Sequence, residues 1–223
     1  MKKTILLDAL GTLLEFKDPV AALRTQLAAR GVEISSVEAR KAITAEIEYY
    51  RAHILDGRDR HGLDDLRERC TAVLGVELPP HARIVGLREV LEDSLVFEPY
   101  EEVAGILALL KDRGHQLVVV SNWDISLHDV LARTGLDELL DGVVVSAQRG
   151  IAKPNSLLFA AALATVGGRA AESLHVGDDL EADVGGARAA QIEPVWIDRH
   201  GEPPAPEGVR RITSLRGLPE LAA

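Results

Sequence analysis

The sequence predicts an α/β fold in which a parallel sheet forms the core and an all-helical domain is inserted near its start. Short, almost wholly apolar runs alternate with amphipathic helical segments, which is typical of parallel strands joined by helical crossovers. One long stretch shows helical periodicity only and interrupts this alternation. These two observations favour a Rossmann-like core with a second, helical domain.

The predicted strands are nearly continuous runs of apolar residues, and most are followed at once by a polar residue or glycine. Strands that are covered by helices on both faces have this composition. The last segment of the chain, around 212–215, is expected to lead into a short final strand and helix. The predicted strands are Ile5–Leu7, Leu117–Val120, Val143–Val145, Leu174–Val176 and Pro194–Ile197.

Helices are predicted between these strands. Glu101–Arg113 carries apolar residues at helical spacing and ends at Gly114, a residue type that often terminates helices. The order strand, helix, strand implies right-handed crossovers. The other core helices are expected at Ser126–Thr134, Asn155–Val166 and Asp183–Ala190.

The region 17–97 contains no convincing strand and is predicted to be a separate helical domain. The core would then comprise 1–16 and 98–223. Breaks between its helices are expected at Gly31, Asp56-Gly57 and Pro79-Pro80, because glycine and proline interrupt helices. The expected helices are Pro19–Arg30, Val37–Arg51, Leu63–Leu74 and His81–Asp93.

Composition narrows the class of protein. Hydrophobic residues make up 47% and charged residues 27% of the 223 residues, the balance of a globular protein. A net charge of −10 makes nucleic acid an unexpected partner. The single cysteine, Cys70, excludes an intramolecular disulfide, and Asp8 interrupts the first apolar run too early for a signal peptide. We expect a cytoplasmic protein with no membrane span; the sequence does not indicate its oligomeric state.

Polar groups follow four of the apolar runs. Asp8, Ser121 and Asp178 each stand at or just after the end of a predicted strand, and Lys153 follows a fourth strand by a few residues. Ligands bind at the carboxyl ends of strands in open parallel sheets. The four side chains are therefore expected in one crevice.

This set of groups suits phosphoryl transfer. A carboxylate can attack phosphorus and form an acyl phosphate. Two carboxylates, Asp8 and Asp178, can hold Mg²⁺, which prefers oxygen ligands and neutralises an anionic substrate. Lys153, Ser121 and the backbone N–H of Asn122 would bind phosphate oxygens. A small phosphorylated molecule is thus the expected substrate.

The ordered motifs resemble those of the haloacid dehalogenase superfamily, and the helical insert resembles the first class of cap domain in that superfamily. The likeness covers essentially the whole chain. It is carried by Asp8-Ala9-Leu10-Gly11-Thr12-Leu13, Ser121-Asn122, Lys153-Pro154 and Gly177-Asp178-Asp179-Leu180-Glu181-Ala182-Asp183.

The resemblance implies a role for each motif position. Asp8 would be the nucleophile, and Thr12 would hydrogen-bond Asp8. The carbonyl of Leu10 and the carboxylate of Asp178 would complete the protein ligands of Mg²⁺. Ser121 and Lys153 would bind the transferring phosphoryl group, with Asn122 beside them. Asp183 and Asp179 would hold waters and Lys153 around the metal.

The sequence departs from the superfamily pattern at Leu10, where phosphatases carry a second aspartate as general acid and base. Leucine carries no proton, and loss of such a group costs about 10²–10⁴ in rate. Related proteins of a poorly characterised branch also vary at this position. The resemblance therefore implies a hydrolase of small phosphorylated metabolites. It does not fix the rate of this hydrolase, because Leu10 replaces the general acid and base.

Other activities remain alternatives. Substrates with good leaving groups, such as acyl or aryl phosphates, would not need the acid. 2-Haloacid dehalogenases lack the second aspartate, but they do not use a metal-binding fourth motif. A phosphonoacetaldehyde hydrolase would need a Schiff-base lysine in the cap, for which Lys41 is a candidate. A catalytically weak protein that binds a ligand or partner is a further alternative, whereas a receiver domain would be shorter and would lack the insert.

Several residues have two interpretations. His175 is either a core histidine or a base, and Trp123 and Asp124 either line the pocket or serve structure. A cluster of polar and aromatic residues in the helical domain either selects the substrate or forms a solvated helix face. This cluster comprises Tyr49, Tyr50, Arg51, His53, Arg58, Arg60 and His61.

Overall fold

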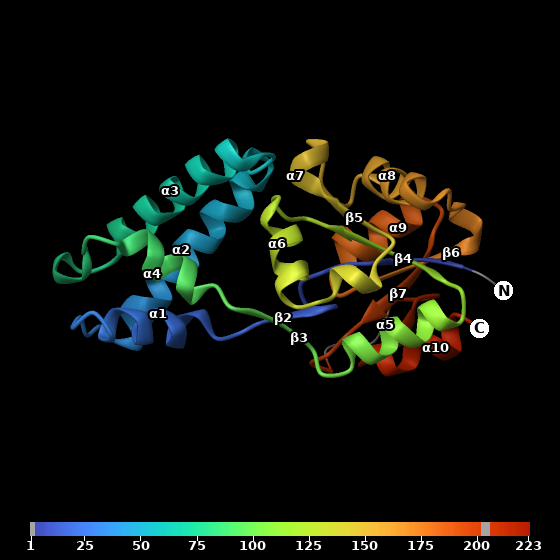
Figure 1. Ribbon diagram of the computed structural model, residues 1–223, viewed down its shortest axis with the longest axis horizontal. Helices are drawn as coiled ribbons and strands as arrows, with labels where there is room; N and C mark the ends of the chain where they lie inside the picture. Colours follow the sequence, from blue (N-terminus) through green and yellow to red (C-terminus); the bar gives the residue numbers. More distant parts are fainter. Residues whose placement is uncertain (1–2, 202–205) are drawn as a thin grey trace. The chain divides into compact units, whose positions relative to one another are not determined.

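The computed structural model describes residues 3–201 and 206–223. The chain forms two compact units: Met1–Glu15 together with Pro99–Ala223, and Phe16–Glu98. In the described residues, the first unit contains a six-stranded sheet in the order β5-β4-β1-β6-β7-β8, and every pairing in it is parallel (Figure 1). This confirms the predicted α/β class. The strands are β1 (Thr4–Leu7), β4 (Gln116–Ser121), β5 (Gly142–Val145), β6 (Ser173–Gly177), β7 (Glu193–Ile197) and β8 (Arg210–Ile212).

The central strand β1 pairs with β4 on one side and β6 on the other, with Leu7 in register with Val119 and Val176. From β1 the chain continues to β4 and β5, whereas from β6 it continues to β7 on the opposite side. The direction of winding thus reverses between β1 and β6. Ligands of open α/β sheets bind at such a reversal, beyond the carboxyl ends of the strands.

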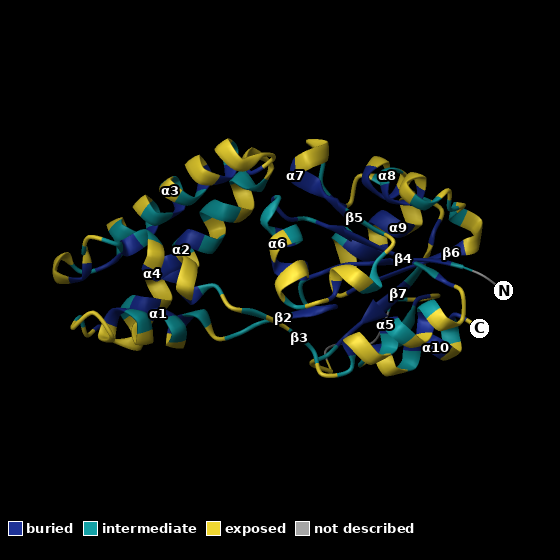
Figure 2. Cartoon of the chain, in the orientation of Figure 1, coloured by how far each residue is buried: buried dark blue, intermediate teal, exposed yellow. Residues whose placement is uncertain are grey.

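Helices cover both faces of the sheet, which explains the continuous apolar runs of its strands. Leu6 and Val118 pack in one cluster with Leu158 and Phe159 of α8 (Ser156–Val166). Side chains alternate along a strand, so Ile5 and Leu7 point to the other face, and they too are fully buried. The strands in the middle of this unit are mostly in the colour of buried residues in Figure 2. The remaining helices of this unit are α5 (Val103–Asp112), α6 (Ser126–Arg133), α7 (Ser146–Arg149), α9 (Gly186–Ala189) and α10 (Leu218–Leu221).

The second unit is helical and has its own apolar core. Asp18 caps the first helix, and Ser35 with Glu38 forms a reciprocal capping box at the second, so both helices begin where backbone N–H groups find side-chain acceptors. Leu23 and Leu74 are fully buried in this core. Its helices are α1 (Pro19–Ala28), α2 (Ser36–His53), α3 (Arg60–Glu77) and α4 (Leu87–Ser94).

The structure corrects several predicted elements. The helix expected over His81–Asp93 is a short 3₁₀ turn, Pro80–Ala82, followed by α4, because Gly86 takes a left-handed φ of 82° that no helix continues through. The helix expected over Asp183–Ala190 is a π-helical turn, Leu180–Gly185, followed by α9. Two short strands that the sequence did not predict, β2 (Leu14–Phe16) and β3 (Phe97–Pro99), pair with each other. None of the described helices combines the length and apolarity that crossing a membrane requires.

Candidate active site

The four predicted side chains, which lie at or beyond the ends of separate strands, come together where the direction of winding of the sheet reverses. Asp8 follows β1 and is buried, and Ser121 ends β4 with its hydroxyl 3.0 Å from Asp8 Oδ1. Lys153 Nζ lies 2.5 Å from the same oxygen. The Asp8 carboxylate is therefore oriented through Oδ1 by one hydroxyl and one ammonium group. Burial raises the pKa of the Asp8 carboxyl, while Lys153 opposes that rise.

Lys153 joins two carboxylates in the interior. Its ammonium group also lies 2.6 Å from Asp183 Oδ1, and only 3% of the side chain is exposed. Burial by itself would lower the pKa of Lys153, but Asp183 and Asp8 outweigh burial and raise it. The ammonium is thus held in its charged form between the nucleophile candidate and Asp183.

Asp183 is the meeting point of a second set of contacts. His175 Nε2 lies 2.9 Å from Asp183 Oδ1, and the backbone N–H of Asp179 donates to Oδ2 at 3.1 Å. Burial works to raise the pKa of Asp183, yet Lys153 and His175 hold it well below its usual range. Gly177 makes room for this carboxylate, since a Cβ there would lie 2.1 Å from Asp183 Cγ. His175 is therefore a buried partner of the site rather than an isolated core histidine.

The carboxylates of Asp8, Asp178 and Asp183 form an acidic cluster whose candidate ligand oxygens all lie within 4.8 Å of one another. Asp178 stands at the exposed edge of the cluster. Desolvation by surrounding groups, then repulsion from Asp8 and Asp183, raises the pKa of Asp178 to about 7. A bound cation would relieve this repulsion, and the oxygen ligands suit Mg²⁺. The residues present thus fit the predicted metal.

The loop after Asp8 also fits the cluster. Gly11 has a φ of +77°, and a Cβ on it would lie 2.2 Å from Asp178 Oδ2. Only glycine allows this backbone conformation so close to the carboxylate. Leu10 is half-buried and offers no titratable group. Any role it has toward a metal is confined to its carbonyl oxygen.

Thr12 does not make the hydrogen bond that was predicted with Asp8. Its Oγ1 is buried and has no hydrogen-bond partner among the described residues. The carbonyl of Thr12, in contrast, accepts from Arg199 Nη2 at 2.7 Å. The hydrogen bond of Thr12 in this part of the site is therefore made by its main-chain carbonyl.

Asn122 has a role that the sequence did not reveal. Its Nδ2 donates to the carbonyl of Lys153 at 3.0 Å, and its Oδ1 accepts from the N–H of Lys153 at 2.7 Å. The amide side chain thereby holds the main chain of Lys153. In the sequence, only its position next to Ser121 marked Asn122 as a residue of the site.

The remaining polar residues of these loops mostly support the backbone. Asp179 Oδ1 accepts from the N–H groups of Glu181 and Ala182, so it caps the π-helical turn. Asp124 accepts from the N–H of Ser126 at 2.6 Å, and Trp123 is buried. The contacts of Asp179 and Asp124 favour the structural interpretation of these two residues.

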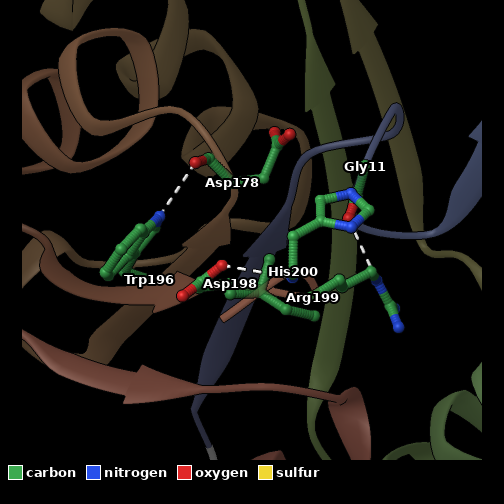
Figure 3. A pocket seen from close by; sticks show the side chains of 7 residues that line it. Gly11, Asp178, Trp196, Asp198, Arg199 and His200 are labelled. Carbon is green, nitrogen blue, oxygen red and sulfur yellow. Dashed lines mark hydrogen bonds between the residues drawn. The ribbon is translucent and has the colours of Figure 1, made fainter. Parts of the chain in front are cut away.

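A small pocket of about 140 Å³ opens beside the acidic cluster, at the ends of β6 and β7 (Figure 3). The indole Nε1 of Trp196 donates to the carbonyl of Asp178 at 2.9 Å and supports the backbone there. Arg199, on the other side of the pocket, donates through Nε to the carbonyl of Gly11 at 3.0 Å. No motif in the sequence marked Arg199. The pocket is lined by Gly11, Asp178, Trp196, Ile197, Asp198, Arg199 and His200.

In the helical unit, the polar and aromatic cluster is partly tied together. Tyr49 stacks on His53 with ring centroids 4.0 Å apart, and Arg69 donates to the Tyr49 hydroxyl at 3.0 Å. Lys41, the candidate Schiff-base lysine, is exposed and ion-paired with Glu77 at 2.8 Å. An exposed, paired ammonium lacks the desolvation that activates such a lysine.

Comparisons with known proteins identify similar sequences and a similar fold. The family described as haloacid dehalogenase-like hydrolase matches residues 2–191. Ribulose-1,5-bisphosphate 5-phosphatase of Halopiger xanaduensis is 36% identical over 108 residues, which are 48% of this chain and 45% of that protein. Phosphoserine phosphatase of Thermus thermophilus is 37% identical over 109 residues, 48% and 44% of the two chains. The matches thus span somewhat under half the length of these curated relatives.

A solved structure resembles the whole chain. The crystal structure of a HAD phosphatase from Thermococcus onnurineus aligns with a TM-score of 0.67 at 25% sequence identity, covering 99% of this chain and 97% of that chain. The fold likeness therefore extends beyond the part of the sequence that matches the curated relatives.

Proposed function

Because the chain belongs to the haloacid dehalogenase-like hydrolase family, we propose that it is a magnesium-dependent phosphatase that hydrolyses a small phosphorylated metabolite through an aspartyl phosphate on Asp8. The observation that carries the proposal is the convergence of Ser121 and Lys153 on one oxygen of Asp8. Relatives named as phosphatases support the same class of substrate.

In the first step, an Asp8 carboxylate oxygen attacks phosphorus and the bond between phosphorus and the ester oxygen breaks. Ser121 and Lys153 orient the carboxylate for this attack by donating to Oδ1. The ammonium of Lys153 also offsets negative charge on the transferring phosphoryl group. Mg²⁺, held by Asp8, Asp178 and the Leu10 carbonyl, would supply charge neutralisation at the phosphate.

In the second step, water attacks the phosphorus of the aspartyl phosphate, inorganic phosphate leaves and Asp8 is regenerated. Leu10 provides no proton for the departing alkoxide in the first step and accepts none from water in the second. The leaving group must therefore take its proton from solvent, so esters with acidic leaving groups should be preferred. Acyl and aryl phosphates are the best candidates of this kind.

The unit Phe16–Glu98 is proposed to act as a cap that selects the substrate, because helical inserts can serve as lids. A metal-independent 2-haloacid dehalogenase is less well supported, because it has no use for the cluster of Asp8, Asp178 and Asp183.

The alternative function is ligand or partner binding by a protein with little catalysis, and Leu10 is the observation that favours it. The test is an assay of wild type, Asp8→Asn and Asp178→Asn on an aryl phosphate and an acyl phosphate, with and without Mg²⁺. Turnover that needs Mg²⁺ and both aspartates supports the phosphatase. Wild type indistinguishable from Asp8→Asn on both esters supports the binding protein instead.

A further inference from the structure

Arg199 makes a set of contacts that no motif predicts. Its side chain is 10% exposed and donates hydrogen bonds through all three of its nitrogen atoms. Nε donates to the carbonyl of Gly11 at 3.0 Å, and Nη2 donates to the carbonyl of Thr12 at 2.7 Å. Nη1 donates to Glu102 Oε1 at 2.9 Å. The guanidinium carbon also lies 3.5 Å from the ring centroid of Tyr100. Only the planar, forked guanidinium can satisfy these acceptors together.

The two carbonyls that Arg199 holds belong to the turn immediately after Asp8. This turn is closed by backbone hydrogen bonds from Gly11 to Leu14 and from Leu13 and Leu14 to Ala9, each 2.8 Å long. Leu10, whose carbonyl is a proposed Mg²⁺ ligand, lies inside it. From outside, the turn is held by the N–H of Tyr100, which donates to the carbonyl of Leu13 at 3.1 Å, and by the side chain of Arg199.

Glu102 anchors the guanidinium from the other side. It also accepts from the hydroxyl of Ser214 at 3.0 Å and from the N–H of Leu215 at 3.3 Å. Burial tends to raise the pKa of Glu102, but hydrogen bonds and Arg199 together lower it. The ion pair joins the turn to the start of α5 and to the C-terminal segment, both of which are parts of the same unit.

We propose that Arg199 is a positioning residue that holds the turn after Asp8 in the conformation required for the metal site. The inference rests on the proposed function as far as Mg²⁺ is concerned. Arg199 contacts neither the proposed ligands' side chains nor the proposed nucleophile; it acts through the main chain of Gly11 and Thr12.

A positioning role and a purely electrostatic role of Arg199 predict opposite effects of its removal on the affinity for Mg²⁺. Arg199 is a cation near a cation site, and on charge alone its removal would strengthen Mg²⁺ binding. If its role is to hold the turn, removal weakens Mg²⁺ binding instead, by about tenfold or more, as is typical for groups that orient metal ligands. Arg199→Gln removes both the positive charge and the planar guanidinium with its several donors. Arg199→Lys keeps the charge but loses the guanidinium.

The experiment measures two quantities on wild type, Arg199→Lys, Arg199→Gln and the control Arg216→Gln. Arg216 pairs with Glu101 on the surface, so its replacement removes one charge without touching the turn. Calorimetric titration with MgCl₂ gives Kd, and amide hydrogen exchange of metal-free protein gives the protection of residues 9–14. We expect both Arg199 variants to raise Kd about tenfold and to accelerate exchange in 9–14, and Arg216→Gln to change neither.

Unchanged exchange in 9–14, or an equal or tighter Kd in Arg199→Gln, would overturn the inference. Absence of Mg²⁺ binding by wild type overturns the metal in the proposed function, and the exchange measurement then decides by itself whether Arg199 holds the turn. If Arg199→Gln does not fold, Arg199→Lys, which retains the ion pair with Glu102, gives the answer.

Discussion

The side-chain amide of Asn122 is bonded to both main-chain groups of Lys153, donating to its carbonyl at 3.0 Å and accepting from its N–H at 2.7 Å. Lys153 is therefore positioned from its backbone as well as through Asp8 and Asp183. This pair of hydrogen bonds links the loop after β4 to the loop after α7. It makes the geometry at Lys153 depend on the side-chain amide of Asn122.

Asn122→Ala should lower kcat by about 10- to 100-fold, because small displacements of a catalytic group carry penalties of this size. The control is Asn155→Ala, which removes the amide directly after Lys153-Pro154 that caps α8 by accepting from the N–H of Leu157. That variant should lower thermal stability without a comparable loss of kcat. Equal kcat for wild type and Asn122→Ala would contradict the prediction.

Lys153→Met should destabilise the protein by about 3–5 kcal/mol, since it leaves Asp8 and Asp183 buried without their counter-ion. Lys111→Met is the matched control: Lys111 pairs with Asp141 at 3.3 Å, with about a third of each side chain exposed. Its loss should cost at most about 1 kcal/mol. Urea unfolding of both variants at pH 7 measures the difference, and similar values for the two would argue against a buried ion-pair network.

Gly177→Ala should abolish activity and destabilise the fold, because the added Cβ would lie 2.1 Å from Asp183 Cγ and displace that carboxylate. Gly105→Ala in α5 is the counterpart, since a Cβ there meets nothing within 4 Å. It should stabilise the protein by about 0.5–1 kcal/mol through helix propensity. Melting temperatures and initial rates test the pair together; an active Gly177→Ala enzyme would refute the packing argument.

Glu46→Gln should stabilise the helical unit at neutral pH. Glu46 is 3% exposed within α2, and burial raises its pKa from 4.5, although a hydrogen bond from Cys70 partly opposes the rise. A carboxyl whose folded-state pKa is raised contributes stability below its unfolded pKa and loses it as pH rises through the folded value. The advantage of Glu46→Gln over wild type should therefore be absent near pH 4 and grow as pH increases.

Unfolding free energies measured between pH 4 and pH 8 test this dependence. Glu48→Gln, which removes a charge from an exposed position of the same helix, controls for net charge. A difference between Glu46→Gln and wild type that stays constant over this range would show that burial does not perturb the carboxyl.

Leu10→Asp should restore a general acid and raise kcat/KM on alkyl phosphates by about 10²–10⁴. Aryl phosphates should gain much less, because their leaving groups need no proton. Leu10→Asn, which matches the shape without an acidic group, is the control. Equal gains in the Asp and Asn variants would mean that polarity, not proton transfer, limits the wild-type enzyme.

Sequence pattern alone was sufficient for the parallel sheet and for the convergence of Asp8, Ser121, Lys153 and Asp178. Apolar runs that end in polar residues specify strand ends, and parallel strands bring those ends to one edge whatever the intervening chain contains. The break at Gly86 escaped prediction, because glycine within a periodic apolar pattern is compatible with a helix until its φ is known.

Tertiary structure alone decided the partners of Asn122, His175 and Arg199. Each of these side chains bonds a group that the sequence pattern does not mark as its partner: the backbone of Lys153, the carboxylate of Asp183, and the carbonyls of Gly11 and Thr12. Periodicity reports which face of an element is apolar, but it carries no information on which loops meet. The contacts of these residues were therefore decided by the packing of the fold, whereas the proposed reacting groups were already evident from their positions at or near the strand ends.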